Sequence, residues 1–174
     1  MTVISVIVGS TRDGRFSEKP AKWILDHLKK RDGVDARLLD LLDFPMPFFD
    51  QPTTPATPGR PAFEHEVVQR WTTAIAESDG FVFVTPEYNY GPAAVLKNAI
   101  DWVYPEWHRK PAGFVSYGSA MGARGVQQLR ETRSSSSSPR FVHRFTSPSP
   151  RCGLTTRAAM SGLDWPSWRR PPAR

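Results

Sequence analysis

A cluster of small polar residues and an arginine follows the first apolar run of the chain. Residues 9–17 read GSTRDGRFS, with Ser10 and Ser17 as hydroxyl groups and Arg12 as a cation. A turn of this kind before a helix exposes backbone N–H groups, and the arginine fork suits a phosphate. The residues lack the spacing of a triphosphate loop or of GxGxxG, so a single phosphate monoester is the expected ligand. An ordinary polar turn with a solvated arginine is the alternative.

Two more polar segments follow later apolar runs. Residues 86–92 read PEYNYGP, and residues 116–122 read SYGSAMG. Prolines and glycines stiffen a backbone whose N–H and C=O groups can hydrogen-bond the edge of a flat heterocycle, with aromatic side chains nearby. Each segment taken separately is also explained as a stiff structural loop. Placed together on one edge, the three segments fit a ligand with a phosphate at one end and a heterocycle at the other.

The elements that must position these segments alternate between strand and helix. Apolar and β-branched runs predict strands, and apolar residues three and four apart predict helices. We expect Ser17 to cap the first helix and Pro92 to begin the third. The expected strands are 2–8, 34–41, 80–84 and 111–116, and the expected helices are 17–32, 63–78, 92–103 and 123–131, with a long loop at 43–62.

This alternation predicts the α/β class, with helices on both faces of a parallel sheet. Ligands in such folds bind outside the carboxyl ends of the strands, where the strand order reverses. All three polar segments follow predicted strands, so they would meet at that edge. The chain has 174 residues, which is the size of one domain, and no apolar run long enough to span a membrane.

Three stretches in this order resemble the NADPH-dependent FMN reductase family, which shares a flavodoxin-like fold with bacterial quinone, azo-dye and chromate reductases. They read GSTRDGRFS, PEYNYGPAAVLKNAIDWV and GFVSYGSAMGARGVQQLR, and the resemblance covers residues 2–131. It implies a flavodoxin-like three-layer α/β/α domain over residues 1–131. The implied function is an NAD(P)H oxidoreductase that passes electrons through FMN to a quinone, free flavin or similar small acceptor. A non-catalytic electron carrier, a flavin-binding protein and an inactive remnant are the alternatives.

The resemblance also implies the residues of an FMN site. By this match, the phosphate would be held by Ser10, Arg12 and Ser17. The isoalloxazine would be lined, largely through backbone groups, by Pro86, Glu87, Tyr88 and Asn89. Its other side would be closed by Ser116, Tyr117 and Gly118. No side chain is expected to be catalytic, because N5 of the flavin carries the chemistry. NADPH or NADH would be the co-substrate, and the family implies a homodimer or tetramer. Lys97, Asn98 and Asp101 are expected to be structural.

Charge and cysteine content exclude several function classes. The net charge is −1 over residues 1–131 and +7 over residues 132–174, so the basicity lies wholly in the tail and does not indicate a nucleic-acid partner. The four histidines and the single cysteine, Cys152, lack the spacing of metal ligands, so no metal is expected. One cysteine permits no intrachain disulfide, which favours a cytoplasmic location.

The sequence changes character at Thr132. Residues 132–174 are rich in Ser, Arg and Pro and show no strand or helix pattern, so the last strand and helix of the family are expected to be lost or replaced. The strand at 111–116 would then be an unprotected edge. Codons exist for residues 133–150 that encode a helix and a strand when read one base earlier. We therefore interpret the tail as frameshifted and disordered, and a basic tail that contacts nucleic acid or anionic lipid is the alternative.

Overall fold

Strands and helices alternate along the chain as the sequence predicts. The computed structural model describes residues 1–134 and 144–148. The strands are β1 (Thr2–Val8), β2 (Val34–Asp40), β3 (Gly80–Tyr88), β4 (Gly91–Pro92), β5 (Ala112–Gly118) and β6 (Arg144–Pro148). The helices are α1 (Glu18–Leu28), α2 (Glu66–Glu77), α3 (Ala94–Asp101) and α4 (Ala123–Ser134), with a short 3-10 helix, η1 (Pro105–Trp107). No helix of the described residues is long and apolar enough to cross a bilayer.

The sheet has the strand order β2-β1-β3-β5-β6, and its neighbouring strands are parallel. The short strand β4 pairs only with β3, antiparallel, and lies off this path. With β4 set aside, the order is the flavodoxin-like one, in which the chain winds outward from β1 to β2 and then crosses to β3. The strand order therefore reverses between β1 and β3, and the carboxyl ends of these strands frame the expected ligand position. The α/β/α fold class is confirmed.

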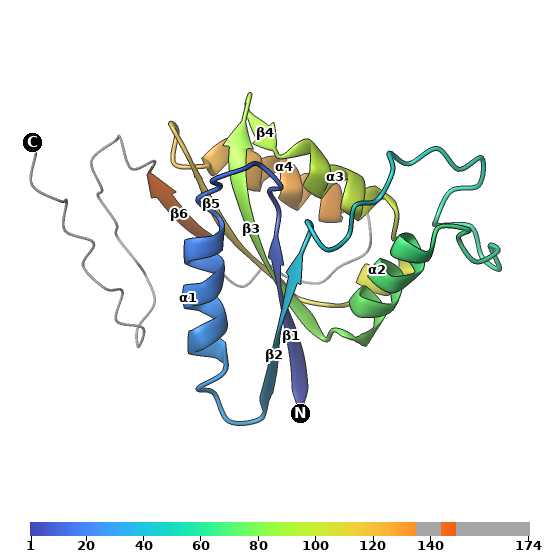
Figure 1. Ribbon diagram of the computed structural model, residues 1–174, viewed down its shortest axis with the longest axis horizontal. Helices are drawn as coiled ribbons and strands as arrows, with labels where there is room; N and C mark the ends of the chain where they lie inside the picture. The colour runs from blue at the N-terminus through green and yellow to red at the C-terminus, as the bar shows by residue number, and fades with distance from the viewer. Residues whose placement is uncertain (135–143, 149–174) are drawn as a thin grey trace, which may run out of the picture.

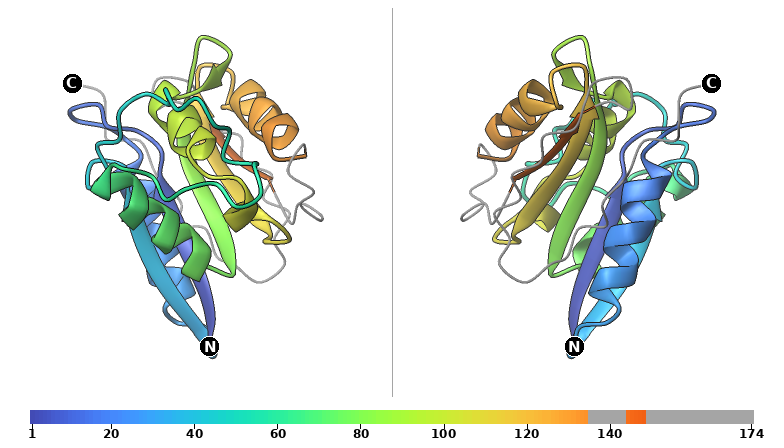
Figure 2. Two further views of the ribbon diagram at one scale, coloured as in Figure 1. Left: turned by 90° about the vertical axis from the view of Figure 1, so that its right-hand side faces the viewer. Right: turned by 90° about the vertical axis from the view of Figure 1, so that its left-hand side faces the viewer.

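The two faces of the sheet bury different helices. Val6 and Val8 of β1 pack with Ile24 of α1 on one face. Ile7 points to the opposite face, where α2, α3 and α4 pack around residues such as Trp71 and Phe83, both 0% exposed. Figure 2 shows α1 on one side of the sheet and α4 on the other. Because successive residues of a strand face opposite sides, the continuously apolar run of β1 serves both layers.

The second polar segment is a hairpin, which corrects two expected boundaries. Strand β3 continues through Pro86 to Tyr88 and pairs with Gly91 of β4. The two residues between them, Asn89 and Tyr90, have φ of 46° and 72°. Positive φ at both central positions is the geometry of a type I′ turn, whose twist matches that of paired strands. Pro92 therefore belongs to β4, and the prediction that it begins a helix was wrong, since α3 begins at Ala94.

A strand follows α4, contrary to the sequence-based expectation. Strand β6 pairs in parallel with Phe114–Gly118 of β5, so the prediction that β5 is an unprotected edge was wrong. Helix α4 also continues to Ser134, past the expected end at 131. An edge strand is held by backbone hydrogen bonds, which almost any residue supplies, and this explains why composition did not reveal it. The remainder of the expected disordered, frameshifted tail, residues 135–143 and 149–174, lies outside the described residues.

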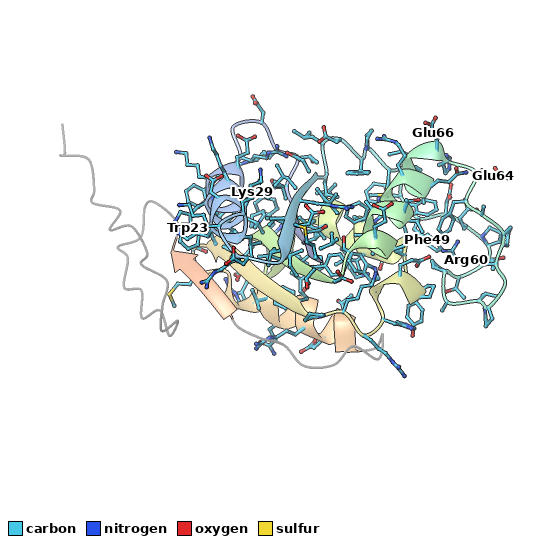
Figure 3. All side chains as sticks on the ribbon, turned by 90° about the horizontal axis from the view of Figure 1, so that it is seen from below. Trp23, Lys29, Phe49, Arg60, Glu64 and Glu66 are labelled. Atoms are coloured by element: carbon cyan, nitrogen blue, oxygen red, sulfur yellow. The ribbon has the colours of Figure 1, made fainter. Side chains whose placement is uncertain are left out.

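The long loop before α2 is held by the side chain of Asn98 in α3. Its amide nitrogen donates to the Pro47 carbonyl at 2.9 Å, and its oxygen accepts from the Phe49 N–H at 3.0 Å. Lys97 and Asp101 form an exposed ion pair on the same helix. Figure 3 shows Phe49 at the opposite end of the molecule from α1. These contacts agree with the structural role expected for the three family residues of α3.

Candidate functional site

The segments that follow β1, β3 and β5 meet at the carboxyl edge of the sheet (Figure 1). They converge around Tyr117 at the end of β5, whose ring packs edge-on against Phe16 with 4.9 Å between centroids. Burial raises the pKa of the Tyr117 phenol, and contact with Ser17 opposes that shift. The charges of Tyr88 and Arg12 also act on this pKa, raising and lowering it respectively. The structure thus brings together residues from all three predicted segments at the β1/β3 switch point.

Ser10 and Ser17 place two buried hydroxyl groups in the first segment, at 1% and 0% exposure. Ser17 precedes α1, but its backbone is already helical (φ −56°, ψ −25°) and its side chain does not bond the helix, so the predicted cap was wrong. Its Oγ lies beside Tyr117 and makes no well-formed hydrogen bond to any described residue. A buried hydroxyl in that state is costly. It fits one oxygen of a phosphate bound at this helix N-terminus.

The two arginines of the first segment have opposite environments. Arg12 is exposed, and within residues 1–134 its guanidinium forms no hydrogen bond or ion pair. Arg15 is 8% exposed, and its guanidinium donates to the Ser10 carbonyl at 2.6 Å, to Asp40 at 2.7 Å and to Glu18 at 2.9 Å. The hydrogen bond with Asp40 raises the pKa of Arg15 above its usual value. Arg12 is therefore available to an anion, whereas Arg15 is committed to the protein.

The carboxylate of Glu87 is directed toward α4. The side chain is 3% exposed and accepts the backbone N–H groups of Arg124 at 3.0 Å and Gly125 at 3.4 Å. It also accepts Nε of Arg124 at 2.6 Å. An acidic group at a helix N-terminus satisfies free N–H groups and the helix dipole together. Glu87 therefore fixes the β3–β4 hairpin to α4, and only its backbone is left to face a ligand.

Arg124 completes this attachment of the hairpin. Its guanidinium lies over the ring of Tyr90, with 3.6 Å to the centroid, while the same side chain pairs with Glu87. Cation–π contact and ion pair together hold the tip of the hairpin against the start of α4. Sequence reasoning missed the roles of Arg124 and Arg15. The only signals available were an arginine at the start of a predicted helix and a second arginine in GSTRDGRFS.

The third segment turns tightly above the end of β5. Ser116 is 0% exposed and lies beneath Gly122, where an added Cβ would stand 2.2 Å from the Ser116 Oγ. Gly122 has φ of +69°, so both its conformation and this close approach require glycine. The Ser116 side chain thus supports the turn from below. Tyr117 and Gly118 lie nearer the open edge, and Gly118 packs against Glu87, whose Cβ would be 3.1 Å from an added Cβ.

The fold and the three converging segments define a flavodoxin-like α/β protein with a binding site at the β1/β3 switch point. A family model described as NADPH-dependent FMN reductase matches residues 2–140. The chain belongs to this family of oxidoreductases, whose cofactor is FMN. The match passes the domain boundary expected at residue 131, and that boundary stays a prediction.

Curated relatives agree with the family. An NAD(P)H-dependent FMN reductase from Nectria sp is 41% identical over 135 residues, covering 76% of this chain and 67% of the relative. One from Schizosaccharomyces pombe is 41% identical over 127 residues, covering 73% of this chain and 63% of the relative. The chain thus spans about two thirds of the length of these relatives, 67% and 63%.

Solved structures show the same fold. FerB, a flavoenzyme NAD(P)H:(acceptor) oxidoreductase from Paracoccus denitrificans, superposes with a TM-score of 0.63 at 26% identity, covering 82% of this chain and 76% of FerB. An azoreductase from Bacillus anthracis superposes with a TM-score of 0.64 at 18% identity, covering 85% of this chain and 86% of that one. Because the azoreductase is only 18% identical, its likeness to this chain shows the fold alone.

Proposed function

We propose that this chain is an FMN-dependent NAD(P)H oxidoreductase that delivers electrons to a quinone, a free flavin or a similar small acceptor. The names of the relatives support the class, since several are FMN or quinone reductases. The observation that carries the proposal is the pairing of two features at one edge. One is a phosphate-sized polar segment with a buried hydroxyl and a free arginine, and the other is a rigid hairpin beside the end of β5.

The first segment would hold the phosphate of FMN. Ser17 offers a hydroxyl that is buried beside Tyr117 without a well-formed hydrogen bond to the described residues. Arg12 offers an uncommitted guanidinium. The N-terminus of α1 adds the positive end of a helix dipole. Together with Ser10, these groups supply the charge and the donors that a phosphate monoester requires.

The hairpin and the end of β5 would line the isoalloxazine. The side chain of Glu87 is held by α4, so Pro86, Glu87, Tyr88 and Asn89 would contact the ring through their backbone, as the family resemblance implies. Tyr117 and Gly118 would close the other side. When bound, FMN would accept a hydride from NAD(P)H and pass electrons on to the acceptor. The protein's part is to orient the ring and to leave one face open.

Location and assembly belong to the proposal as well. We place the protein in the cytoplasm, because its single cysteine permits no intrachain disulfide. We propose a homodimer or tetramer, as the family implies, and small molecules as its partners.

Steady-state turnover tests the proposed activity. The protein is loaded with FMN, freed of excess flavin and mixed with NADPH and a benzoquinone, and NADPH oxidation is followed by absorbance. We expect many turnovers per chain with a rate that saturates in quinone. Arg37→Ala, which removes an exposed ion pair with Glu77 at 2.8 Å, is the control and should turn over like the native chain. One reduction per chain without turnover would indicate an electron carrier, and no NADPH oxidation would refute the proposal.

A further inference from the structure

We propose that Arg15 is a positioning residue that holds the phosphate-binding segment in its working shape, an inference that rests on the proposed FMN site. Its backbone N–H donates to the Arg12 carbonyl at 3.2 Å, which closes a turn over residues 12–15. Gly14 within that turn has φ of +61°, a conformation that favours glycine. The turn displays Arg12 at one end, exposed, and buries Arg15 at the other. The two arginines therefore have separate tasks.

The guanidinium of Arg15 ties the segment to the sheet. It donates to the Ser10 carbonyl at 2.6 Å and, in a bidentate arrangement, to the two carboxylate oxygens of Asp40 at the end of β2. Because the peptide unit is planar, holding the Ser10 carbonyl toward Arg15 directs the Thr11 N–H to the opposite side, where an anion can be bound. The Arg12 N–H in turn approaches the Ser10 Oγ at 3.5 Å. The Arg15 side chain thus fixes the orientation of the Ser10–Thr11 peptide unit, and the Ser10 hydroxyl contacts the next unit.

The charges around Arg15 exclude a direct phosphate contact in this conformation. Two carboxylates, Asp40 and Glu18, surround the one guanidinium, so the cluster carries no positive charge that could attract an anion. The Arg15 side chain is 5% exposed, and four of its five N–H donors are used by these partners. Buried bidentate pairs of this kind fix geometry rather than capture ligands from solution. The effect on phosphate must therefore pass through Ser10 and Arg12.

The Asp40→Asn variant separates positioning from direct binding. If Arg15 positions the segment, losing its carboxylate partner should weaken FMN binding about tenfold, because a hydrogen-bonded charge pair is broken. If Arg15 bound phosphate directly, removing the negative charge of Asp40 would strengthen FMN binding. Dissociation constants for FMN and for riboflavin, which lacks the phosphate, are measured by quenching of flavin fluorescence. Riboflavin affinity should stay within about twofold, since only the phosphate end is disturbed.

Ionic strength gives a second readout, which distinguishes a buried positioning pair from an exposed arginine that contacts the phosphate directly. The weakening in Asp40→Asn should persist when salt is raised, because a buried pair is screened little. The weakening in Arg12→Ala should shrink, because that arginine is exposed. Arg37→Ala removes a doubly paired but exposed arginine elsewhere and should leave both flavins unaffected.

Each result has a distinct meaning. Tighter or unchanged FMN binding in Asp40→Asn would overturn the positioning role alone. Equal weakening of FMN and riboflavin, with a lower melting temperature of the flavin-free protein, would also overturn it by showing only a structural role. Failure of the native chain to bind FMN would instead refute the proposed function, and this inference with it.

Discussion

Replacing Glu87 with Gln tests how the ring end of the site is built. Glu87 is 3% exposed and joins the β3–β4 hairpin to α4 through Nε of Arg124 at 2.6 Å and the Arg124 N–H at 3.0 Å. Glutamine keeps the size of the side chain but loses its charge. It retains one acceptor oxygen and brings two donors toward a guanidinium and an N–H group that also donate.

The structure sets the size of the effect. Hydrogen bonds to a charged group contribute about 1.5–3 kcal/mol, and one good acceptor remains in the variant. The Arg124 side chain is 34% exposed, so water offsets part of the lost ion pair. We therefore expect the free energy of unfolding to fall by about 2 kcal/mol. With a urea slope of about 2 kcal/mol/M, the unfolding midpoint should fall by about 1 M.

Urea unfolding of the flavin-free protein measures this change. Glu131→Gln is the matched control, since Glu131 is exposed on α4, the helix to which Glu87 is attached. It should change the free energy of unfolding by less than about 0.5 kcal/mol. The Glu87 variant should also bind FMN and riboflavin more weakly by the same factor, because it loosens the ring end and leaves the phosphate end intact. A midpoint equal to that of Glu131→Gln, or a loss confined to FMN, would refute this account of the hairpin.

Three further predictions concern the core of the site and its supports. Burial raises the pKa of Tyr117 in the folded protein, so the unfolded chain releases the phenol proton first. The stability that Tyr117 contributes is therefore constant below about pH 10 and is lost as pH rises through the folded pKa. Above about pH 10, the melting temperature of Tyr117→Phe should fall less with pH than that of the native chain. Gly122→Ala should lower the melting temperature far more than Gly33→Ala, because both glycines have positive φ but only Gly122 would bring a Cβ within 2.2 Å of Ser116; equal melting temperatures would contradict the observed packing. Asn98→Ala should cost about 1–2 kcal/mol, because the Phe49 N–H loses its partner while the Pro47 carbonyl keeps the Trp102 indole N–H at 2.8 Å; limited proteolysis should then cut the long loop sooner than in the native chain.

Much of the layer architecture follows from sequence pattern alone. The run TVISVIV predicts β1 at its observed bounds, and the spacing of Ala21, Ile24 and Leu25 predicts α1 and its buried face. These segments are predictable because the same pattern that favours the element also buries it. The placement of three polar segments at one edge follows in the same way, from the rule that parallel strands end together.

What sequence could not show depends on contacts between distant residues. Pro86 is read as a loop residue, yet it lies in β3, where it pairs with Tyr117 of β5, and the strand continues to the type I′ turn at Asn89 and Tyr90. Ser17 has the composition of a helix cap, yet its backbone is already helical and its hydroxyl lies beside Tyr117.

The roles of Arg15 and Glu87 were missed for the same reason. Their partners, Asp40 and Arg124, are 25 and 37 residues away in the chain. Strand β6 was missed because an edge strand is stabilised by its neighbour's backbone, whatever its own composition.

Equilibrium binding of FMN to the native chain and to Arg12→Ala, with riboflavin in parallel, tests most directly whether the three segments form an FMN site. The native chain should bind one FMN per chain and prefer it to riboflavin. Arg12→Ala should weaken FMN at least about tenfold, the usual scale for a charge-assisted hydrogen bond, and leave riboflavin unchanged. The account is contradicted if the native chain binds neither flavin, or if it binds both with equal affinity whether or not Arg12 is present.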